Sequence, residues 1–391
     1  MSHVLPVGST IGILGGGQLG RMTAMAARRL GYRTVVLDPD PAGPGAQVAD
    51  RHIAGRLDDA GAMRALADIA DVVTYEFENV DADAVAALES LVPVHPSSAV
   101  LRVSQHRIRE KTTVVGLGAP VPPFRAASST DELEDALSAL PFPLVMKTAT
   151  GGYDGKGQAV VRDREGAFSA FHRLKAGTDT LIVERQVDLA MEISVICARD
   201  VNGNVALYPP AENRHRRGIL DVSTAPAPVC ARVAGRAAAI AETLAQGLQL
   251  VGVLAVEMFV DRDGEVLVNE LAPRPHNSGH HTIEAAAVSQ FEQLVRILAG
   301  LPLGDTRIAR PAAMANLLGD LWGPEGAPPD FARMLAVPGV RLHLYGKEQP
   351  RPGRKMGHLT VVADTVDEAI ARVLRARGDR EDGGPHEISL H

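Results

Sequence analysis

Two glutamates interrupt apolar stretches near the middle of the chain. Glu257 lies within Val251–Val260, and Glu270 lies within Val266–Leu271. The turn Asp261-Arg-Asp-Gly264 joins these two predicted strands into a hairpin. Burying carboxylates without partners is costly, whereas Mg²⁺ binds one or two carboxylates beside nucleotide phosphates. The pair therefore predicts a magnesium site, and two solvent-facing glutamates on an exposed hairpin are the alternative.

A lysine ends an apolar strand directly before a glycine-rich loop. Lys147 belongs to the predicted strand Pro143–Thr148, and Gly151-Gly-Tyr-Asp-Gly-Lys-Gly-Gln158 follows it. Such a loop supplies backbone donors that can close over polyphosphate while the lysine neutralises its charge. The Gly-Lys-Ser/Thr ending of a Walker loop is missing. A flexible hairpin tip is the alternative, which four glycines after a lysine-bearing strand disfavour.

Two further segments concentrate polar groups. Asn269–His280 holds a carboxylate, a guanidinium, imidazoles and amides, and Arg274 in it could hold a carboxylate or another oxyanion. His276 and His280 could equally be surface residues. Arg341–His358 carries five lysines and arginines against one glutamate, in a chain of net charge −7. This patch suits a phosphate monoester, with a solvated basic face as the alternative.

The N-terminal glycine loop suggests a different chemistry. Gly15-Gly-Gly-Gln-Leu-Gly20 follows a predicted strand and precedes a helix, and Asp38 ends the next strand, as in a dinucleotide fingerprint. The glycines equally fit a tight turn, and the helix N-terminus favours any anion. A nicotinamide oxidoreductase would rest on this loop alone, because nothing nearby supplies a hydride-transfer partner.

The elements that must position these groups fall into three parts. Strands at Thr10–Leu14, Thr34–Asp38 and Asp71–Tyr75 alternate with helices, which predicts a parallel sheet covered on both faces. One helix is expected from Ser98 to Val115, before the hinge Ala119-Pro-Val-Pro-Pro-Phe124.

Beyond that hinge the pattern changes towards strands and glycine turns. Thr130 or Asp131 is expected to cap a short helix, and strands are expected near Leu181, Ile193 and Val205. A long helix spans about Pro228 to Leu248. Pro302–Pro338 predicts irregular structure before a final small module.

Composition and charge exclude several classes. With 391 residues, 46% of them apolar and 22% charged, the chain is long enough for two or three domains. The net charge of −7 argues against nucleic-acid binding by overall positive charge. Two cysteines, Cys197 and Cys230, disfavour a disulfide framework. No membrane span or signal segment is apparent, so we expect a cytoplasmic protein with no nucleic-acid or membrane partner.

The whole pattern resembles the ATP-grasp enzymes, and specifically the family of N5-carboxyaminoimidazole ribonucleotide synthetases of purine biosynthesis. The segments that carry the resemblance are Gly15–Met22, Gly151–Gln158, Asn269–His280 and Arg351–His358. It implies an α/β and α+β fold: a Rossmann-like pre-ATP-grasp domain at 1–102, an ATP-grasp domain at 103–300 and a small C-terminal domain at 301–391. A mobile clamp subdomain would span about 119–187. Family members are typically homodimers.

The resemblance also implies a reaction and a set of site residues. ATP, bicarbonate and 5-aminoimidazole ribonucleotide would give the N5-carboxy product, ADP and phosphate through carboxyphosphate. Mg²⁺, with Mn²⁺ as a substitute, would be held by Glu257 and Glu270. Catalytic roles would fall to Lys147, Tyr153, Asp154 and Arg274. ATP would be contacted by Arg107, Lys147, Gly152, Tyr153, Asp154, Gly155, Lys156, Gly157, Gln158, Glu184, Arg185, Gln186, Val187, Glu192, His215, Asn269 and Glu270.

The ribonucleotide and bicarbonate would be bound by a second set. Its members are Gln18, Leu19, Glu76, Tyr153, Asp154, Arg274, His276, Asn277, Lys347, Arg354 and Lys355. Arg185-Gln186 departs from the Gln-Gly pair often found in the family; main-chain contacts to adenine would tolerate this change. The alternative within the superfamily is a formate-dependent glycinamide ribonucleotide transformylase or a biotin carboxylase, which should lack the cluster Arg351–His358.

Overall fold

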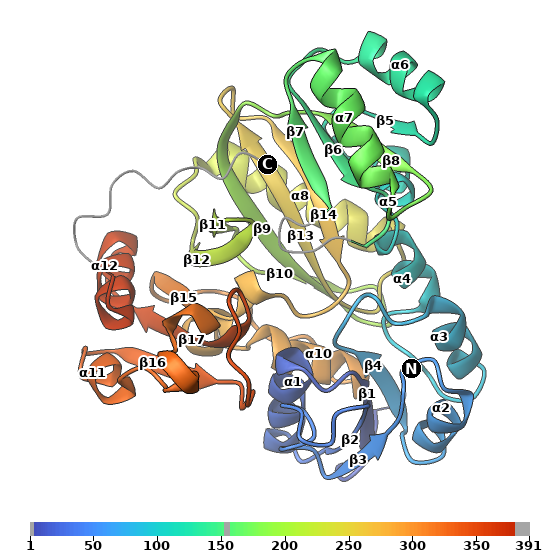
Figure 1. Cartoon of the computed structure of the whole chain (residues 1–391). Helices are drawn as coiled ribbons and strands as arrows, with labels where there is room; N and C mark the ends of the chain where they lie inside the picture. Colours follow the sequence, from blue (N-terminus) through green and yellow to red (C-terminus); the bar gives the residue numbers. More distant parts are fainter. Residues whose placement is uncertain (1–3, 152–156, 380–391) are drawn as a thin grey trace.

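The computed structural model describes residues 4–151 and 157–379 (Figure 1). Five residues expected in the site therefore lie outside the described residues: Gly152, Tyr153, Asp154, Gly155 and Lys156. Within the described ranges, no helix is both long and apolar enough to cross a membrane.

The N-terminal part is a four-stranded parallel sheet, as the sequence predicts. Its strands are β1 (Thr10–Leu14), β2 (Arg33–Asp38), β3 (Arg51–Ala54) and β4 (Val72–Tyr75), in the order β3-β2-β1-β4. Helices α1 (Gln18–Arg29), α2 (Ala60–Ala67) and α3 (Ala82–Glu89) accompany it. A helix from later in the chain, α10 (Gln290–Leu298), also packs against α1. This contact joins the first sheet to the central part (Figure 1).

The single helix expected from Ser98 to Val115 is wrong. The structure has α4 (Ser98–Ser104) and α5 (Arg107–Gly116) instead. His106 caps α5 by accepting a hydrogen bond from the Arg109 amide, and the Arg107 amide donates to the carbonyl of Ala149 at 2.8 Å. Contacts with a distant loop thus break a segment whose local pattern is helical throughout.

A second, antiparallel sheet forms the clamp at the top of Figure 1. Its strands are β5 (Phe124–Ala127), β8 (Leu181–Arg185), β6 (Leu144–Thr148) and β7 (Gln158–Val161), in that order. It is accompanied by α6 (Thr130–Ala139) and α7 (Arg164–Lys175). The cap of α6 is Ser129 rather than Thr130 or Asp131, because the Ser129 hydroxyl accepts a hydrogen bond from the Glu132 amide.

The largest sheet carries the predicted glutamate hairpin. In the described part of the chain it has nine strands, ordered β14-β13-β9-β11-β12-β15-β17-β16, with β10 paired to β9. Their bounds are β9 (Leu189–Arg199), β10 (Val205–Leu207), β11 (Ala211–Arg216), β12 (Ile219–Ala225), β13 (Gly252–Asp261), β14 (Val266–Ala272), β15 (Ala312–Leu318), β16 (Val340–Leu344) and β17 (Lys355–Val362). Helix α8 (Ala231–Gly247) packs on it through a large apolar cluster that includes Ile240, Leu244 and Leu254.

The C-terminal strands continue this sheet, since β15 pairs with β12. The expectation of irregular structure throughout Pro302–Pro338 is therefore wrong. β15 lies inside that stretch, and its residues Ala312 to Leu317 are buried. The prolines and glycines of this stretch are typical of irregular structure, so the local sequence pattern did not indicate the apolar strand. Helices α11 (Phe331–Leu335) and α12 (Val366–Arg377) complete this part.

Candidate active site

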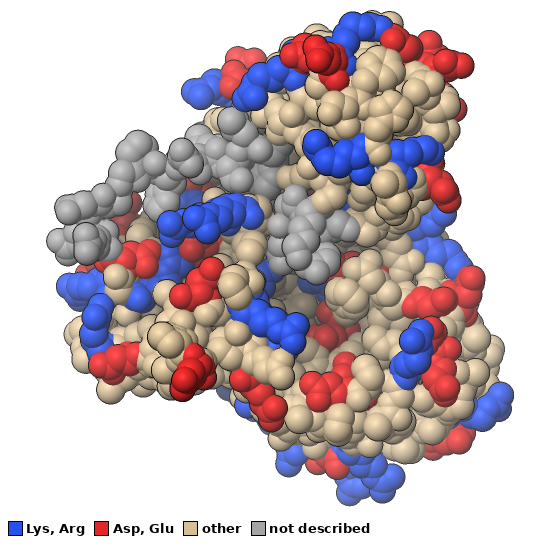
Figure 2. Space-filling model, viewed as in Figure 1, with Lys and Arg blue, Asp and Glu red and all other residues tan. Residues whose placement is uncertain are grey.

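Two adjoining cavities lie between the clamp, the central sheet and the first sheet. One, of about 300 Å³, contains most of the polar residues expected from the sequence. Its lining includes Arg107, Lys147, Gln158, Glu192, His215, Glu257, Asn269, Glu270, Arg274, His276, Asn277 and Lys355. The other, of about 470 Å³, is lined by apolar side chains together with Lys147, residues 184–188 and Arg262. In Figure 2 the molecule is hollowed at its centre, with acidic and basic side chains around the hollow.

Size alone does not select this site. A wider hollow of about 720 Å³ lies beside the hinge segment Gly118–Ala126, and no carboxylate lines it. A site for a metal and charged ligands needs carboxylates as well as cations, so the two adjoining cavities are the better candidates.

The two glutamates of the hairpin face each other. Glu257 on β13 pairs directly with Glu270 on β14, at a bulge between Glu257 and Met258. Burial, and then the charge of Glu257, raises the pKa of Glu270. Burial alone would also raise the pKa of Glu257, but His276, His215 and Arg274 lower it to about 2. A divalent cation would neutralise this half-buried like-charge pair, so the donor set fits a metal.

Within residues 4–151 and 157–379, no three histidines, cysteines or acidic residues gather as a self-sufficient metal site. Two carboxylates agree with a metal whose remaining ligands are phosphate oxygens and water.

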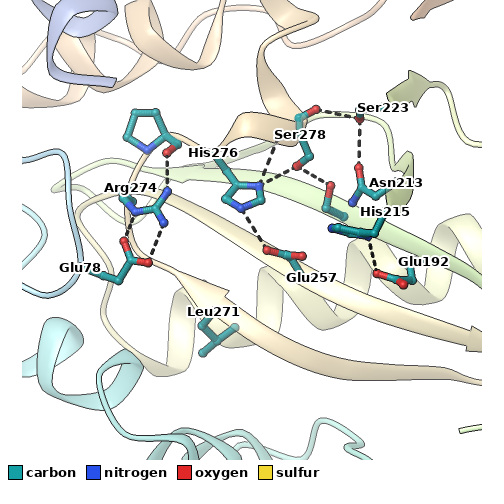
Figure 3. Close-up of polar contacts among 12 residues, drawn as sticks. Glu78, Glu192, Asn213, His215, Ser223, Glu257, Leu271, Arg274, His276 and Ser278 are labelled. Atoms are coloured by element: carbon teal, nitrogen blue, oxygen red, sulfur yellow. Dashed lines mark hydrogen bonds and ion pairs between the residues drawn. The ribbon is translucent and has the colours of Figure 1, made fainter. Parts of the chain in front are cut away.

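A polar network supports one side of the pair (Figure 3). The Nε2 atom of His276 lies 3.0 Å from Glu257 Oε1, and its Nδ1 lies 2.9 Å from the Ser278 hydroxyl. The Ser278 hydroxyl lies 2.7 Å from that of Ser194. These two hydroxyls therefore hold the His276 imidazole on the side away from Glu257. Beside it, both polar atoms of the Asn277 side chain are buried and make no hydrogen bond to the described chain. Asn277 therefore lines the cavity with a side chain whose amide atoms are enclosed by the protein.

Arg274 is already paired within the structure. Glu78, from the segment after β4, receives its guanidinium in a bidentate ion pair, with one distance of 2.7 Å (Figure 3). The ion pair lowers the pKa of Glu78 despite burial, and it raises that of Arg274. Glu78 was not predicted as a site residue, because no local pattern links residues so far apart in the chain. The only signal in the sequence was that Glu78 is a carboxylate two residues after Glu76, which was itself expected in the site.

Lys147 lies at the boundary of the two cavities and lines both. Its ammonium is 2.8 Å from Glu184 Oε2 and 3.4 Å from Asn269 Oδ1. On the opposite wall, His215 Nδ1 lies 2.9 Å from Glu192 Oε2. Burial alone would lower the pKa of His215, but Glu192 raises it. The polar cavity thus combines the Lys147 ammonium and the His215 imidazole with the carboxylate pair.

The N-terminal glycine loop holds an anion that belongs to the protein itself. The carboxylate of Glu76 accepts hydrogen bonds from the amides of Gly17, Leu19 and Gly20, at 2.6 to 3.1 Å. Asp38 likewise accepts from the Gly16 amide at 2.7 Å. The donors that would bind a dinucleotide pyrophosphate are therefore occupied, which argues against the oxidoreductase interpretation.

The basic C-terminal segment reaches this glycine loop. The Lys347 ammonium donates to Gln18 Oε1 and to the Lys355 carbonyl, the latter at 2.7 Å. The Pro352-Gly353 turn is present, with Gly353 at φ +74°. Lys355 lines the polar cavity, whereas Gln18, Leu19, Glu76, Lys347 and Arg354 do not line it. The structure thus connects Lys347 of the basic segment to Gln18 of the glycine loop, and the binding roles of these five residues stay predictions.

Three domain families match the chain in order. They are the ribonucleotide synthetase preATP-grasp domain at residues 8–105, the ATP-grasp domain at 112–291 and the phosphoribosylaminoimidazole carboxylase C-terminal domain at 312–372. The N5-carboxyaminoimidazole ribonucleotide synthase of Bacillus subtilis is 44% identical over 97% of this chain and 98% of its own length. The chain belongs to the N5-carboxyaminoimidazole ribonucleotide synthase family. The enzyme of that name from Brucella melitensis is 46% identical over 91% of this chain and 97% of its own.

Solved structures of N5-carboxyaminoimidazole ribonucleotide synthases have the same fold. An ADP complex of one synthetase superposes with a TM-score of 0.90 at 42% identity, covering 96% of this chain and 98% of that one. The Aspergillus clavatus enzyme in complex with ADP and 5-aminoimidazole ribonucleotide gives a TM-score of 0.85 at 33% identity, covering 95% and 98%. These matches confirm the predicted ATP-grasp architecture with its N- and C-terminal partners. The exact domain boundaries and the individual site residues stay predictions.

Proposed function

We propose that this chain carboxylates 5-aminoimidazole ribonucleotide to its N5-carboxy derivative, consuming ATP and bicarbonate, in purine biosynthesis. The observation that carries the proposal is the half-buried pair Glu257 and Glu270 beside Lys147, in a chain matched over nearly its whole length to this synthase family. It is an ATP-dependent ligase of the ATP-grasp class.

The two cavities divide the substrates between them. The apolar cavity, with Phe142, Val145 and Phe259 in its lining, suits adenine and ribose. Lys147 at the boundary neutralises the phosphates, and Glu257 with Glu270 would hold the cation that accompanies them, which we expect to be Mg²⁺. When bound, that cation supplies charge neutralisation of the phosphates. The ribonucleotide would lie towards Glu76, with its phosphate near Lys347, Arg354 and Lys355.

The residues of this chain position and shield the reactants. Carboxyphosphate is short-lived in water, so it must form and be consumed in one closed, cation-lined space. Arg274, which is paired with Glu78 and lines the polar cavity, would hold a carboxylate-sized anion. No covalent nucleophile is needed, because phosphoryl transfer depends on positioning and charge. Cys197 is buried and Cys230 is exposed, and neither lines the cavities.

Phosphate release from ATP tests the proposal. We expect release to require bicarbonate and the ribonucleotide together with Mg²⁺, and the N5-carboxy product to form in equal amount. Thermal-shift titration with MgADP and NADH is the second test, with stabilisation expected from MgADP. Stabilisation by NADH alone, or turnover only with formate or biotin, would contradict it. We further expect a homodimer, which light scattering of the purified chain would detect.

A further inference from the structure

Lys111 is a buried lysine that lines neither cavity but contacts residues and a strand that form their walls. Lys111 on α5 is 2% exposed, and it lies one residue after Glu110, which is also 2% exposed. Lysine and glutamate are rarely buried to this extent unless they are paired. The partners of the two side chains therefore indicate what they do.

Lys111 bridges two parts of the molecule. Its ammonium lies 3.0 Å from Glu184 Oε1 on the clamp strand β8, and it donates a 3.0 Å hydrogen bond to the carbonyl of Val268 on β14. The other oxygen of Glu184 is 2.8 Å from the Lys147 ammonium. Glu184 thus lies between two lysines, and one of them is the lysine assigned to the phosphates.

The charges of this triad depend on one another. Burial alone would raise the pKa of Glu184, but Lys111 and Lys147 lower it to about 2. Because Lys111 balances Glu184 from behind, Lys147 is not the sole counter-ion of that carboxylate. The part of the Lys147 charge that Glu184 does not neutralise is therefore available to a ligand on the side of Asn269 and the cavities.

The same turn of α5 also holds strand β14, which carries the site residues Asn269 and Glu270. β14 is the edge strand of the nine-stranded sheet, so its outer backbone groups need partners from elsewhere. Lys111 takes the Val268 carbonyl, and Glu110 Oε1 accepts from the Leu271 amide at 2.7 Å. Asn269 and Glu270 lie between these two anchored positions. The edge of the sheet is thereby held where both side chains reach the cavity.

We propose that Lys111 is a positioning residue for the nucleotide phosphates, acting through Glu184 on Lys147 and through the backbone of β14 on Asn269 and Glu270. The inference rests on the proposed function, since it assumes that Lys147 meets ATP. It does not place Lys111 in contact with any substrate.

Lys111→Met tests this role, because it removes the charge and the donor but keeps the length of the side chain. Glu184 is then balanced by Lys147 alone. We expect the KM for ATP to rise at least about 10-fold, while the KM for the ribonucleotide changes less than about 2-fold. Arg109→Met is the matched control, since Arg109 is an exposed cation on the same helix and should leave both constants unchanged.

Conservative and double variants separate positioning from mere stability. Lys111→Arg keeps the charge and should keep the ATP KM within about 3-fold of the wild type, which loss of packing alone would not explain. Lys111→Met combined with Glu184→Gln should lose clearly less ATP affinity than the product of the two single losses, because the two residues act as a unit. Multiplicative losses would overturn the proposal, as would an unchanged ATP KM in Lys111→Met.

Two safeguards keep the test decisive. If Lys111→Met does not fold, Lys111→Gln, which keeps a donor but no charge, is measured by MgADP titration calorimetry, with weaker binding expected and unchanged binding contradicting the inference. A wild-type chain that neither binds MgADP nor turns over ATP would instead refute the proposed function. The two failures are therefore distinguishable.

Discussion

Glu270 faces Glu257 inside the site, and each carboxylate raises the cost of charge on the other. Glu270→Gln keeps the shape of the side chain but removes one of the two charges that would hold the metal. We expect turnover to fall at least about 100-fold, as for loss of a group that acts in phosphoryl transfer. Steady-state kinetics over a range of Mg²⁺ concentrations would measure this.

The fold of the Glu270→Gln variant should be intact, because removing a charge from a repelling pair relieves strain in the metal-free protein. Circular dichroism and a thermal midpoint no lower than that of the wild type would establish this. Near-normal activity at ordinary Mg²⁺ would show that Glu270 is not a metal ligand.

Lys347 and Arg354 belong to the basic C-terminal segment, and the structure brings Lys347 to Gln18 on the glycine loop. Replacing either cation by alanine should raise the KM for 5-aminoimidazole ribonucleotide by about 10- to 150-fold, since a charge-assisted contact to phosphate is lost. The KM for ATP should stay within about 3-fold. Kinetics with each substrate varied separately would test both.

Arg341→Ala provides the control for this prediction. Arg341 is an exposed cation of the same segment and was not assigned to the site. If it weakened ribonucleotide binding as strongly as Lys347→Ala, the effect would come from the overall charge of the segment and not from specific contacts.

At the residue scale, the sequence predicted what local pattern encodes. Glu257 and Glu270 stand out because each interrupts an apolar strand of one hairpin, and the structure places them opposite each other. Glu78 and Lys111 were not identified. Their partners, Arg274 and Glu184, lie far away in the sequence, and neither residue belongs to a periodic motif. Pairing between distant segments depends on tertiary packing, which the pattern of a single segment does not contain.

The N-terminal glycine loop shows why an element can suggest the wrong ligand. Its turn and helix N-terminus bind an anion, as the pattern Gly15–Gly20 predicts, but the anion is the Glu76 carboxylate. Burial raises the pKa of Glu76, and the amides of Gly20 and Gly17 oppose that shift. The loop therefore positions an internal carboxylate that we assign to the ribonucleotide.

Gly17→Ala tests this role of the loop. A Cβ at this position would lie 2.4 Å from Glu76 Oε1, so the carboxylate would have to leave its three amide donors. We expect a loss of about 1–3 kcal/mol in the free energy of unfolding, together with a raised KM for the ribonucleotide. Urea unfolding and steady-state kinetics would measure the two effects.

Gly116→Ala is the comparison for Gly17→Ala. Gly116 ends α5, and a Cβ there would meet no atom within 4 Å. The free energy of unfolding of the Gly116→Ala variant should differ from that of the wild type by less than about 1 kcal/mol. Equal effects at the two positions would mean that contact with Glu76 is not what makes glycine necessary at position 17.

Across the whole molecule, the three parts share structural elements. Helix α10 of the central part packs against α1 of the first sheet, and β12 pairs with β15 of the C-terminal part. The parallel first sheet was predictable from the alternation of strand and helix patterns. The order of the three parts was predictable from the resemblance that the glycine motifs carry. The continuity of the sheet was not, because β15 lies in a stretch rich in proline and glycine and is recognisable as a strand mainly through its pairing with β12 and β17.

This continuity predicts how the chain unfolds. Trp322 is the chain's single tryptophan, and it packs against the apolar cluster formed by β15, β17 and α12. Its fluorescence therefore reports on the C-terminal part, whereas far-ultraviolet circular dichroism reports on the whole chain. If the nine-stranded sheet unfolds as one unit, the urea midpoint of the fluorescence change should coincide with that of the main dichroism change.

MgADP gives the sharper version of this experiment, because it would bind at the clamp and the central sheet and not at Trp322. At 100 times its dissociation constant it should stabilise the unit by about 2.7 kcal/mol. The tryptophan midpoint should then rise together with the dichroism midpoint. A fluorescence transition that MgADP leaves unmoved, while the dichroism transition shifts, would show that residues after 300 unfold as an independent domain despite the pairing of β12 with β15.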